Sequence, residues 1–140
     1  MLKNYFLTFK SNIDDLLADV LRSRIEAIFS EQLVCTVFLV GNLGVGKTTL
    51  TRLLLKADLD SPSFVLRQEY SSNFSCGPKT VAHWDFYRLK SFPLEIYQED
   101  ADLIIVEWPD KFPQSFKVLS PDILCYITTT HVCFVFSVIR

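Results

Sequence analysis

Three of the four glycines in this 140-residue chain lie between positions 41 and 46, directly after a continuous apolar run. Residues 41–48 (GNLGVGKT) match the pattern G-x-x-x-x-G-K-[ST]. The apolar run at 33–40 (LVCTVFLV) predicts a strand that is buried on both faces. Leucines at helical spacing predict a helix over 47–56. A strand, this loop and a helix, in that order, are typical of a loop that binds phosphate.

Each part of the pattern suits phosphate chemistry. Small residues let the backbone N–H groups of the loop turn inward around a phosphate, and the positive end of the helix dipole points at the same oxygens. Lys47 supplies a mobile positive charge, and the Thr48 hydroxyl can ligate Mg²⁺. The alternative is a structural glycine turn with a surface lysine. We expect ATP or ADP with Mg²⁺ to contact Asn42, Leu43, Gly44, Val45, Gly46, Lys47, Thr48 and Thr49.

Two acidic residues at the ends of predicted strands are candidates for the reactive groups. A phosphate loop works with a carboxylate at the end of a neighbouring strand, which holds Mg²⁺ or positions water. Glu107 directly follows the aliphatic run at 103–106 (LIIV), and Asp85 ends the segment TVAHWD. We expect Glu107 and Asp85 to be catalytic, and Thr48 with Glu107 to bind the metal. The alternatives are a solvated glutamate at a strand end and an aspartate that caps a turn.

The sequence leaves open the roles of several other polar and aromatic residues near the loop and the two acidic residues. Ser61 and Ser63 flank Pro62, and hydroxyl groups in such a loop either sense the γ-phosphate or form a plain turn. His83 is either part of the site or a histidine packed in the core. Trp108 is either a stacking partner for a nucleotide base or a core residue.

The order of predicted strands and helices along the chain predicts an α/β fold of the P-loop NTPase type. We expect a mixed, mostly parallel sheet flanked by helices, and a C-terminal β-hairpin. We expect the chain to form a single P-loop ATPase domain over residues 1–140. Strands are expected at 5–9, 64–70, at the start of 80–88, and at 103–106, 123–128 and 132–138. A short helix is expected at 93–99, and an exposed loop at 71–79 (SSNFSCGPK). A long helix is expected after a cap at Ser11, with an apolar face of Ile13, Leu16, Leu17, Val20, Leu21, Ile25 and Ile28.

Composition excludes several classes of function. The formal net charge is −2 and the pI is about 5.6, so no basic excess exists to hold a nucleic acid unaided. The four cysteines form no CxxC pair, which argues against a zinc site or a redox dithiol. The apolar stretch at 132–139 is far shorter than the roughly 20 residues of a membrane span. We expect a cytoplasmic protein with no membrane partner.

Four short motifs together resemble the TsaE family, the small bacterial ATPases of threonylcarbamoyladenosine tRNA modification. The motifs are GNLGVGKTT at 41–49, SPSF at 61–64, HWDFYR at 83–88 and EWP at 107–109. They occur in the order and near the spacing of that family, and the likeness extends over residues 11–130. The HWDFYR and EWP motifs distinguish this family from other proteins better than the phosphate loop does.

The resemblance implies a P-loop ATPase that works with TsaB- and TsaD-like proteins, and that meets tRNA through their complex. It implies that Lys47 and Thr48 bind phosphate and Mg²⁺. It also implies that Glu107 is a metal ligand, and that Asp85 is associated with the metal or positions water. Trp108 is then expected near the nucleotide or the partner surface.

The chain departs from the family's usual pattern in two ways. Asn42 stands where aspartate is usual, and Ser63 stands where threonine is usual, within a loop at 61–64 that the resemblance implies is switch-like. The segments 47–61 and 88–107 are several residues shorter than in familiar members. The shortening affects the surface expected to face the partners more than the nucleotide site.

Three other classes of function are alternatives to this one. A GTPase is disfavoured because neither a D-x-x-G switch motif nor an N-K-x-D guanine signature occurs. A small-molecule kinase of the P-loop type usually closes an arginine-rich lid, whereas only Arg52, Arg67 and Arg88 lie between the loop and Glu107. A nucleotide-binding adaptor without turnover stays open. The lack of a lid also predicts that hydrolysis by the chain alone is slow, because a charge supplied in trans accelerates phosphoryl transfer strongly.

Overall fold

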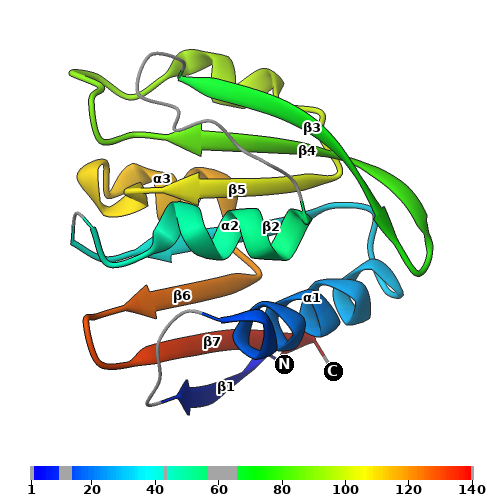
Figure 1. Cartoon of the computed structure of the whole chain (residues 1–140). Coiled ribbons are helices and arrows are strands. Elements are labelled where there is room, and N and C mark those ends of the chain that lie inside the picture. Colours follow the sequence, from blue (N-terminus) through cyan, green and yellow to red (C-terminus); the bar gives the residue numbers. More distant parts are fainter. Residues whose placement is uncertain (1, 10–13, 43, 57–65, 140) are drawn as a thin grey trace.

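The computed structural model describes residues 2–9, 14–42, 44–56 and 66–139. Its centre is one seven-stranded sheet with the order β1-β7-β6-β2-β5-β4-β3 (Figure 1). The four adjacent strands β6, β2, β5 and β4 are parallel, and the antiparallel strands lie at the two sides. The strands are β1 (Leu2–Phe9), β2 (Cys35–Val40), β3 (Arg67–Phe74), β4 (Gly77–Asp85), β5 (Leu103–Glu107), β6 (Ile123–Ile127) and β7 (Val132–Ile139).

Helices cover both faces of this sheet. The two longer helices, α1 (Asp15–Phe29) and α2 (Lys47–Leu55), lie side by side on one face (Figure 1). The other face packs against the 3₁₀ helices η1 (Leu94–Gln98) and η2 (Pro109–Lys111) and the short helix α3 (Gln114–Leu119). The predicted α/β class, with a mixed sheet, flanking helices and a C-terminal hairpin of β6 and β7, is confirmed.

Strand β2 shows why the central sheet is stable. All but the last of its residues are buried, as expected for a strand with helices on both faces. Val37 and Leu39 join the cluster beneath α1 and α2, whereas Phe38 points to the opposite face. There Phe38 packs edge to face against Phe116 of α3, with ring centroids 5.1 Å apart. Burial on both faces therefore anchors the strand that leads into the glycine-rich loop.

The start of α1 differs from the expectation. Asp14 is the N-cap, and its side chain accepts a hydrogen bond from the Leu17 N–H at 3.0 Å. Ser11, the predicted cap, and Ile13 lie outside the described residues. Leu16, predicted on the apolar face, is 69% exposed, because Leu17, Leu21 and the other buried positions define a narrower stripe.

Two other expectations were wrong. The predicted strand at 33–40 begins only at Cys35, because Leu33 and Val34 are exposed at the end of the turn that leaves α1. The predicted loop at 71–79 is a β-hairpin instead, in which β3 and β4 pair down to Phe74 and Gly77. Phe74 is buried against Phe29 of α1, with ring centroids 5.5 Å apart, so a tertiary contact stabilises a segment with turn-like composition.

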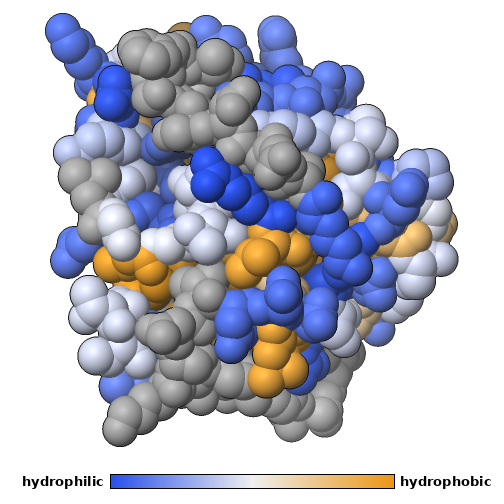
Figure 2. All heavy atoms as spheres, in the orientation of Figure 1, coloured by the Kyte–Doolittle hydropathy of each residue, from blue (hydrophilic) through white to orange (hydrophobic). Residues whose placement is uncertain are grey.

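The predicted helix at 93–99 is the 3₁₀ helix η1, and the sequence pattern did not reveal η2 or α3. No helix in the described part of the chain is both long enough and apolar enough to cross a bilayer. The face that carries α1 and α2 is mostly hydrophilic, with small hydrophobic areas between polar side chains (Figure 2).

Candidate nucleotide-binding site

The glycine-rich loop lies where the parallel strands end. The carboxyl ends of β6, β2, β5 and β4 meet at one edge of the sheet, and the chain leaves β2 there to enter α2 (Figure 1). Gly46 is the N-cap of α2 with a φ of 111°, a left-handed conformation that favours glycine. Its carbonyl accepts the Leu50 N–H at 2.9 Å, so the helix begins directly after the loop. The open edge of a parallel sheet is the usual ligand site of such folds.

Lys47 is held inside the loop. The residue is only 5% exposed, and Nζ donates hydrogen bonds to the carbonyl oxygens of Gly41 at 2.7 Å and Asn42 at 2.8 Å. Burial lowers the pKa of Lys47, and the negative charges of Glu107, Asp85 and Asp110 oppose this effect. The ammonium group is therefore bound by two neutral oxygen acceptors, and phosphate oxygens, which carry negative charge, are stronger acceptors for the same donor.

Thr48 and Glu107 face each other across the loop. The Thr48 hydroxyl oxygen lies 3.3 Å from Oε1 and 3.2 Å from Oε2 of Glu107. Glu107 is 3% exposed and is the last residue of β5, opposite Leu39 on β2 and Asp85 on β4. The structure thus brings together the two residues that were predicted to bind the metal.

The sequence left the role of His83 open, and the structure places this residue against Glu107. It is 1% exposed on β4, and its Nε2 lies 2.5 Å from Oε2 of Glu107. His83 and Asp85 are two positions apart on one strand, so their side chains share the sheet face that carries Glu107. The H-x-D spacing beside a strand that ends in glutamate is the signal from which this contact could have been predicted.

Asp85 has features of both interpretations of the sequence, an aspartate that caps a turn and an acid beside the metal site. Its Oδ1 accepts the Tyr87 N–H at 3.0 Å, which is a turn cap. It also lies next to Glu107 in the β4–β5 register. Burial raises the pKa of Asp85 and the charge of Glu107 adds to the rise, whereas the Tyr87 N–H, His83 and Lys47 act in the opposite direction.

Trp108 lies against the loop lysine. Its backbone has a left-handed φ of 59°, and its N–H donates to the Leu39 carbonyl at 3.3 Å. The Lys47 Nζ is 4.5 Å from the centroid of the indole ring, a cation–π distance. The ring of Tyr87, a residue that is 38% exposed, has its centroid 4.8 Å from that of Trp108. Trp108 is therefore only partly buried, and it contacts the lysine that follows the loop.

The donor set suits Mg²⁺ held jointly with phosphate. Among the described residues, no group of three or more His, Cys, Asp or Glu side chains is arranged to hold a metal alone. Mg²⁺ in nucleotide sites commonly takes one or two protein oxygens and fills its shell with water and phosphate oxygens. The Thr48 hydroxyl and the Glu107 carboxylate, in contact at the loop, fit that requirement.

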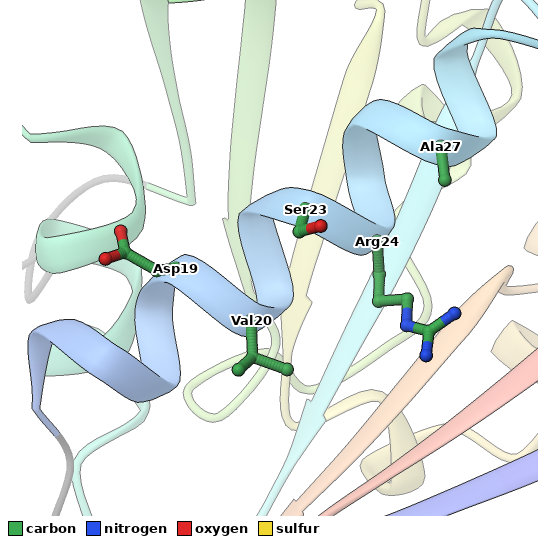
Figure 3. A pocket seen from close by; sticks show the side chains of 5 residues that line it. All are labelled: Asp19, Val20, Ser23, Arg24 and Ala27. Carbon is green, nitrogen blue, oxygen red and sulfur yellow. The ribbon is translucent and has the colours of Figure 1, made fainter.

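The other predicted contact residues are distributed around the same loop. Asn42, Gly44, Val45 and Gly46 form the loop, and Thr49 is exposed in the first turn of α2. Leu43, Ser61 and Ser63 lie outside the described residues. A separate pocket of about 370 Å³ runs along α1, where it is lined by Asp19, Val20, Ser23, Arg24 and Ala27 (Figure 3). It shares no residue with the loop.

Comparison with known proteins gives a consistent result. Residues 14–132 match the family described as threonylcarbamoyl adenosine biosynthesis protein TsaE. The chain is 34% identical over 87 residues to the tRNA threonylcarbamoyladenosine biosynthesis protein TsaE of Haemophilus influenzae, covering 54% of this chain and 52% of that protein. It is 40% identical over 83 residues to the protein of the same name from Streptomyces coelicolor, covering 51% and 55%. The chain thus spans about half the length of the curated relatives that it matches.

A solved structure has the same fold. The crystal structure of YdiB from Bacillus subtilis superposes with a TM-score of 0.60 at 19% identity, over 100% of this chain and 88% of the other. The family match extends over most of the chain and includes the loop, the H-x-D strand and the strand that ends in Glu107. This chain belongs to the TsaE family of threonylcarbamoyl adenosine biosynthesis proteins.

Proposed function

We propose that this chain is a Mg²⁺-dependent ATPase that supports threonylcarbamoyladenosine modification of tRNA. The observation that carries the proposal is the meeting of Lys47, Thr48 and Glu107 at the carboxyl edge of the parallel strands. A buried cation, a hydroxyl group and a carboxylate are the groups that phosphoryl transfer requires at such an edge.

In this proposal the loop binds the phosphates of ATP and ADP. The free N–H groups at the start of α2 and the Lys47 ammonium would contact phosphate oxygens, and Lys47 would exchange its two carbonyl partners for them. Trp108 already contacts Lys47, so it would lie beside the bound nucleotide. Asn42, Leu43, Gly44, Val45 and Thr49 would complete the phosphate-binding surface.

Thr48 and Glu107 would ligate Mg²⁺ through oxygen atoms. When bound there, Mg²⁺ would supply positive charge that offsets the charge of the phosphates. Asp85 lies beside Glu107 on the neighbouring strand, and burial raises its pKa. That position suits a residue that orients water or accepts its proton, so we assign Asp85 the water-positioning role and Glu107 the metal.

The working unit in this proposal is a complex with TsaB- and TsaD-like proteins in the cytoplasm. The net charge of −2 is unsuited to capturing tRNA directly, so the partners would bring the RNA. Arg67 is bound by Glu99 at 2.7 Å and by Glu69 at 3.1 Å, which makes it a poor source of charge for the transition state. We therefore infer slow hydrolysis alone and faster hydrolysis in the complex.

Steady-state phosphate release tests the proposal. We would measure it for the full chain with Mg²⁺ or EDTA, alone and with TsaB- and TsaD-like proteins from the same source. Pull-down of the partners in ATP, ADP and no nucleotide would accompany the assay. We expect Mg²⁺-dependent release that rises with the partners, and a complex whose stability depends on the nucleotide. Binding without turnover would indicate an adaptor instead, and phosphate transfer to a small molecule would indicate a kinase.

A further inference from the structure

His83 contacts the carboxylate that the proposed function assigns to Mg²⁺. Its Nε2 lies 2.5 Å from Oε2 of Glu107, and both side chains are almost completely buried. The residues come from adjacent parallel strands, where Glu107 pairs with Asp85 and His83 pairs with Ile105. The contact is thus fixed by sheet register rather than by a flexible surface loop.

The surroundings of the imidazole ring indicate which nitrogen carries the proton. The other ring nitrogen, Nδ1, is buried and has no hydrogen-bond partner in the described part of the structure. A proton on Nδ1 would leave a buried N–H unpaired and would place two acceptors 2.5 Å apart. A proton on Nε2 turns the short contact into a hydrogen bond and leaves at Nδ1 an unpaired acceptor, which buried sites tolerate more often than an unpaired N–H. The Nε2–H therefore donates a charge-assisted hydrogen bond to the Glu107 carboxylate.

This bond limits the orientations that the Glu107 carboxylate can adopt. Oε2 is held by His83, and the Thr48 hydroxyl lies within 3.3 Å of both carboxylate oxygens. Among the described residues, the other hydrogen-bond contact of the carboxylate is the longer one with the Thr48 hydroxyl, so removing His83 removes its shortest restraint.

We propose that His83 is a positioning residue, whose Nε2–H holds Glu107 in the orientation that lets it ligate Mg²⁺ together with Thr48. The inference rests on the proposed function, and it assigns His83 no contact with nucleotide or metal. Outer partners of this type typically change metal affinity by 10–100-fold when they are removed.

A pair of amide variants separates this role from core packing. In His83→Gln the side-chain amide nitrogen reaches the position of Nε2, whereas in His83→Asn it reaches only that of Nδ1. Both variants are polar and smaller than imidazole, so they disturb the core in similar ways. The full chain would be titrated calorimetrically with ADP, in Mg²⁺ and in EDTA. The readout is the gain in ADP affinity that Mg²⁺ produces.

We expect the wild-type protein and His83→Gln to have the same Mg²⁺-dependent gain within about threefold. His83→Asn should lower the Mg²⁺-dependent gain in ADP affinity by about tenfold. If the wild-type gain is itself less than about tenfold, the variant should show no gain at all. ADP affinity in EDTA should stay within about twofold for all three, because the contacts of Lys47 are unchanged. In a Glu107→Gln background, His83→Asn should have no further effect on the gain, because His83 acts through Glu107.

The outcomes distinguish the two proposals. A wild-type protein that binds no ADP overturns the proposed function itself. Two results would overturn the role of His83 and leave the proposed function standing. In the first, His83→Asn keeps the wild-type gain in ADP affinity from Mg²⁺. In the second, both amide variants lose that gain equally. If neither variant folds, ¹⁵N NMR of the wild-type histidines decides the question. Protonation of His83 on Nδ1 alone would contradict the inference, and protonation on Nε2 would support it.

Discussion

The Lys47 ammonium lies 4.5 Å from the centre of the Trp108 indole ring while it donates hydrogen bonds to the carbonyls of Gly41 and Asn42. Lys47 is therefore joined both to the first two residues after β2 and to the residue after Glu107. Any ligand that draws Lys47 toward its own oxygens must change the contact with Trp108. Loop, lysine and indole thus form one unit at the edge of the sheet.

Lys47→Ala should weaken ADP binding by roughly 1.5–3 kcal/mol, because a hydrogen bond from a charged donor to phosphate is lost. Titration calorimetry with the wild-type protein measures this directly. Lys117→Ala removes an exposed lysine from α3 and serves as the matched control, with unchanged affinity expected. Equal affinities for Lys47→Ala and the wild-type protein would remove the phosphate-loop assignment.

Glu107→Gln should slow hydrolysis by about 100-fold, because the amide keeps the shape of the side chain but not the charge that Mg²⁺ requires. Single-turnover assays at saturating ATP measure the effect. Asp85→Asn should also slow hydrolysis while leaving the Mg²⁺-dependent gain in ADP affinity intact, because we assign it to water and not to the metal. Thermal melts of both variants control for unfolding. Full activity in Glu107→Gln would show that this glutamate is only structural.

Trp108 fluorescence should change when nucleotide binds, because the charge of Lys47 at the indole face moves toward phosphate. The only other tryptophan, Trp84, is buried and donates its Nε1–H to Glu99 at 2.6 Å, so it should give a constant background. Trp108→Phe should abolish the change. An undiminished signal in that variant would place the reporter at Trp84 and contradict the contact between Lys47 and Trp108.

Glu99→Gln should lower the free energy of unfolding at pH 7 by roughly 1.5–3 kcal/mol. The Glu99 side chain is 2% exposed and accepts hydrogen bonds from Arg67 at 2.7 and 2.9 Å and from Trp84 at 2.6 Å. The glutamine variant loses the charge that strengthens these bonds. Chemical denaturation of the two proteins measures the difference.

The same pair of proteins tests the pH dependence. Burial alone would raise the pKa of Glu99, but the hydrogen bonds from Arg67, Trp84 and the Ala101 N–H outweigh it and lower the pKa below 4.5. A carboxylate with a lowered folded-state pKa stabilises the fold above its unfolded-state pKa, and the contribution is lost as pH falls through the folded-state pKa. The difference between Glu99→Gln and the wild-type protein should therefore be full at pH 7 and shrink well below pH 4.5. A difference that is constant down to pH 3 would show that the charge does not matter.

Gly41→Ala should destabilise the fold by more than 1 kcal/mol, on the order of an overpacked core substitution. A Cβ atom at Gly41 would lie 2.5 Å from the Ile127 carbonyl oxygen and 2.8 Å from Cγ2 of Val45. The Val45 side chain can move, but the backbone of β6 cannot do so cheaply. Gly41→Ala combined with Val45→Ala should therefore stay destabilised relative to Val45→Ala alone in thermal melts. Full recovery in the double variant would show that only the Val45 contact is limiting.

The parts of the site that are close together in sequence could be predicted from it. The pattern at 41–48 fixes a loop between a buried strand and a helix, because glycine conformation, apolar runs and helical spacing are local properties. Glu107 was predictable for the same reason, since the aliphatic run before it forms a central strand and delivers it to the sheet edge. The bounds of α2 also agree with the prediction to within one residue.

Only the tertiary structure decided which of these side chains meet. The contacts of His83 with Glu107 and of Lys47 with Trp108 join strands and loops far apart in the chain, and they depend on strand order and register. The hairpin of β3 and β4 was hidden for a related reason: serine, asparagine and glycine predict a loop locally, but Phe74 is buried against α1. Local sequence determines the conformation of short segments, whereas the free energy of pairing distant segments is available only once the sheet has formed.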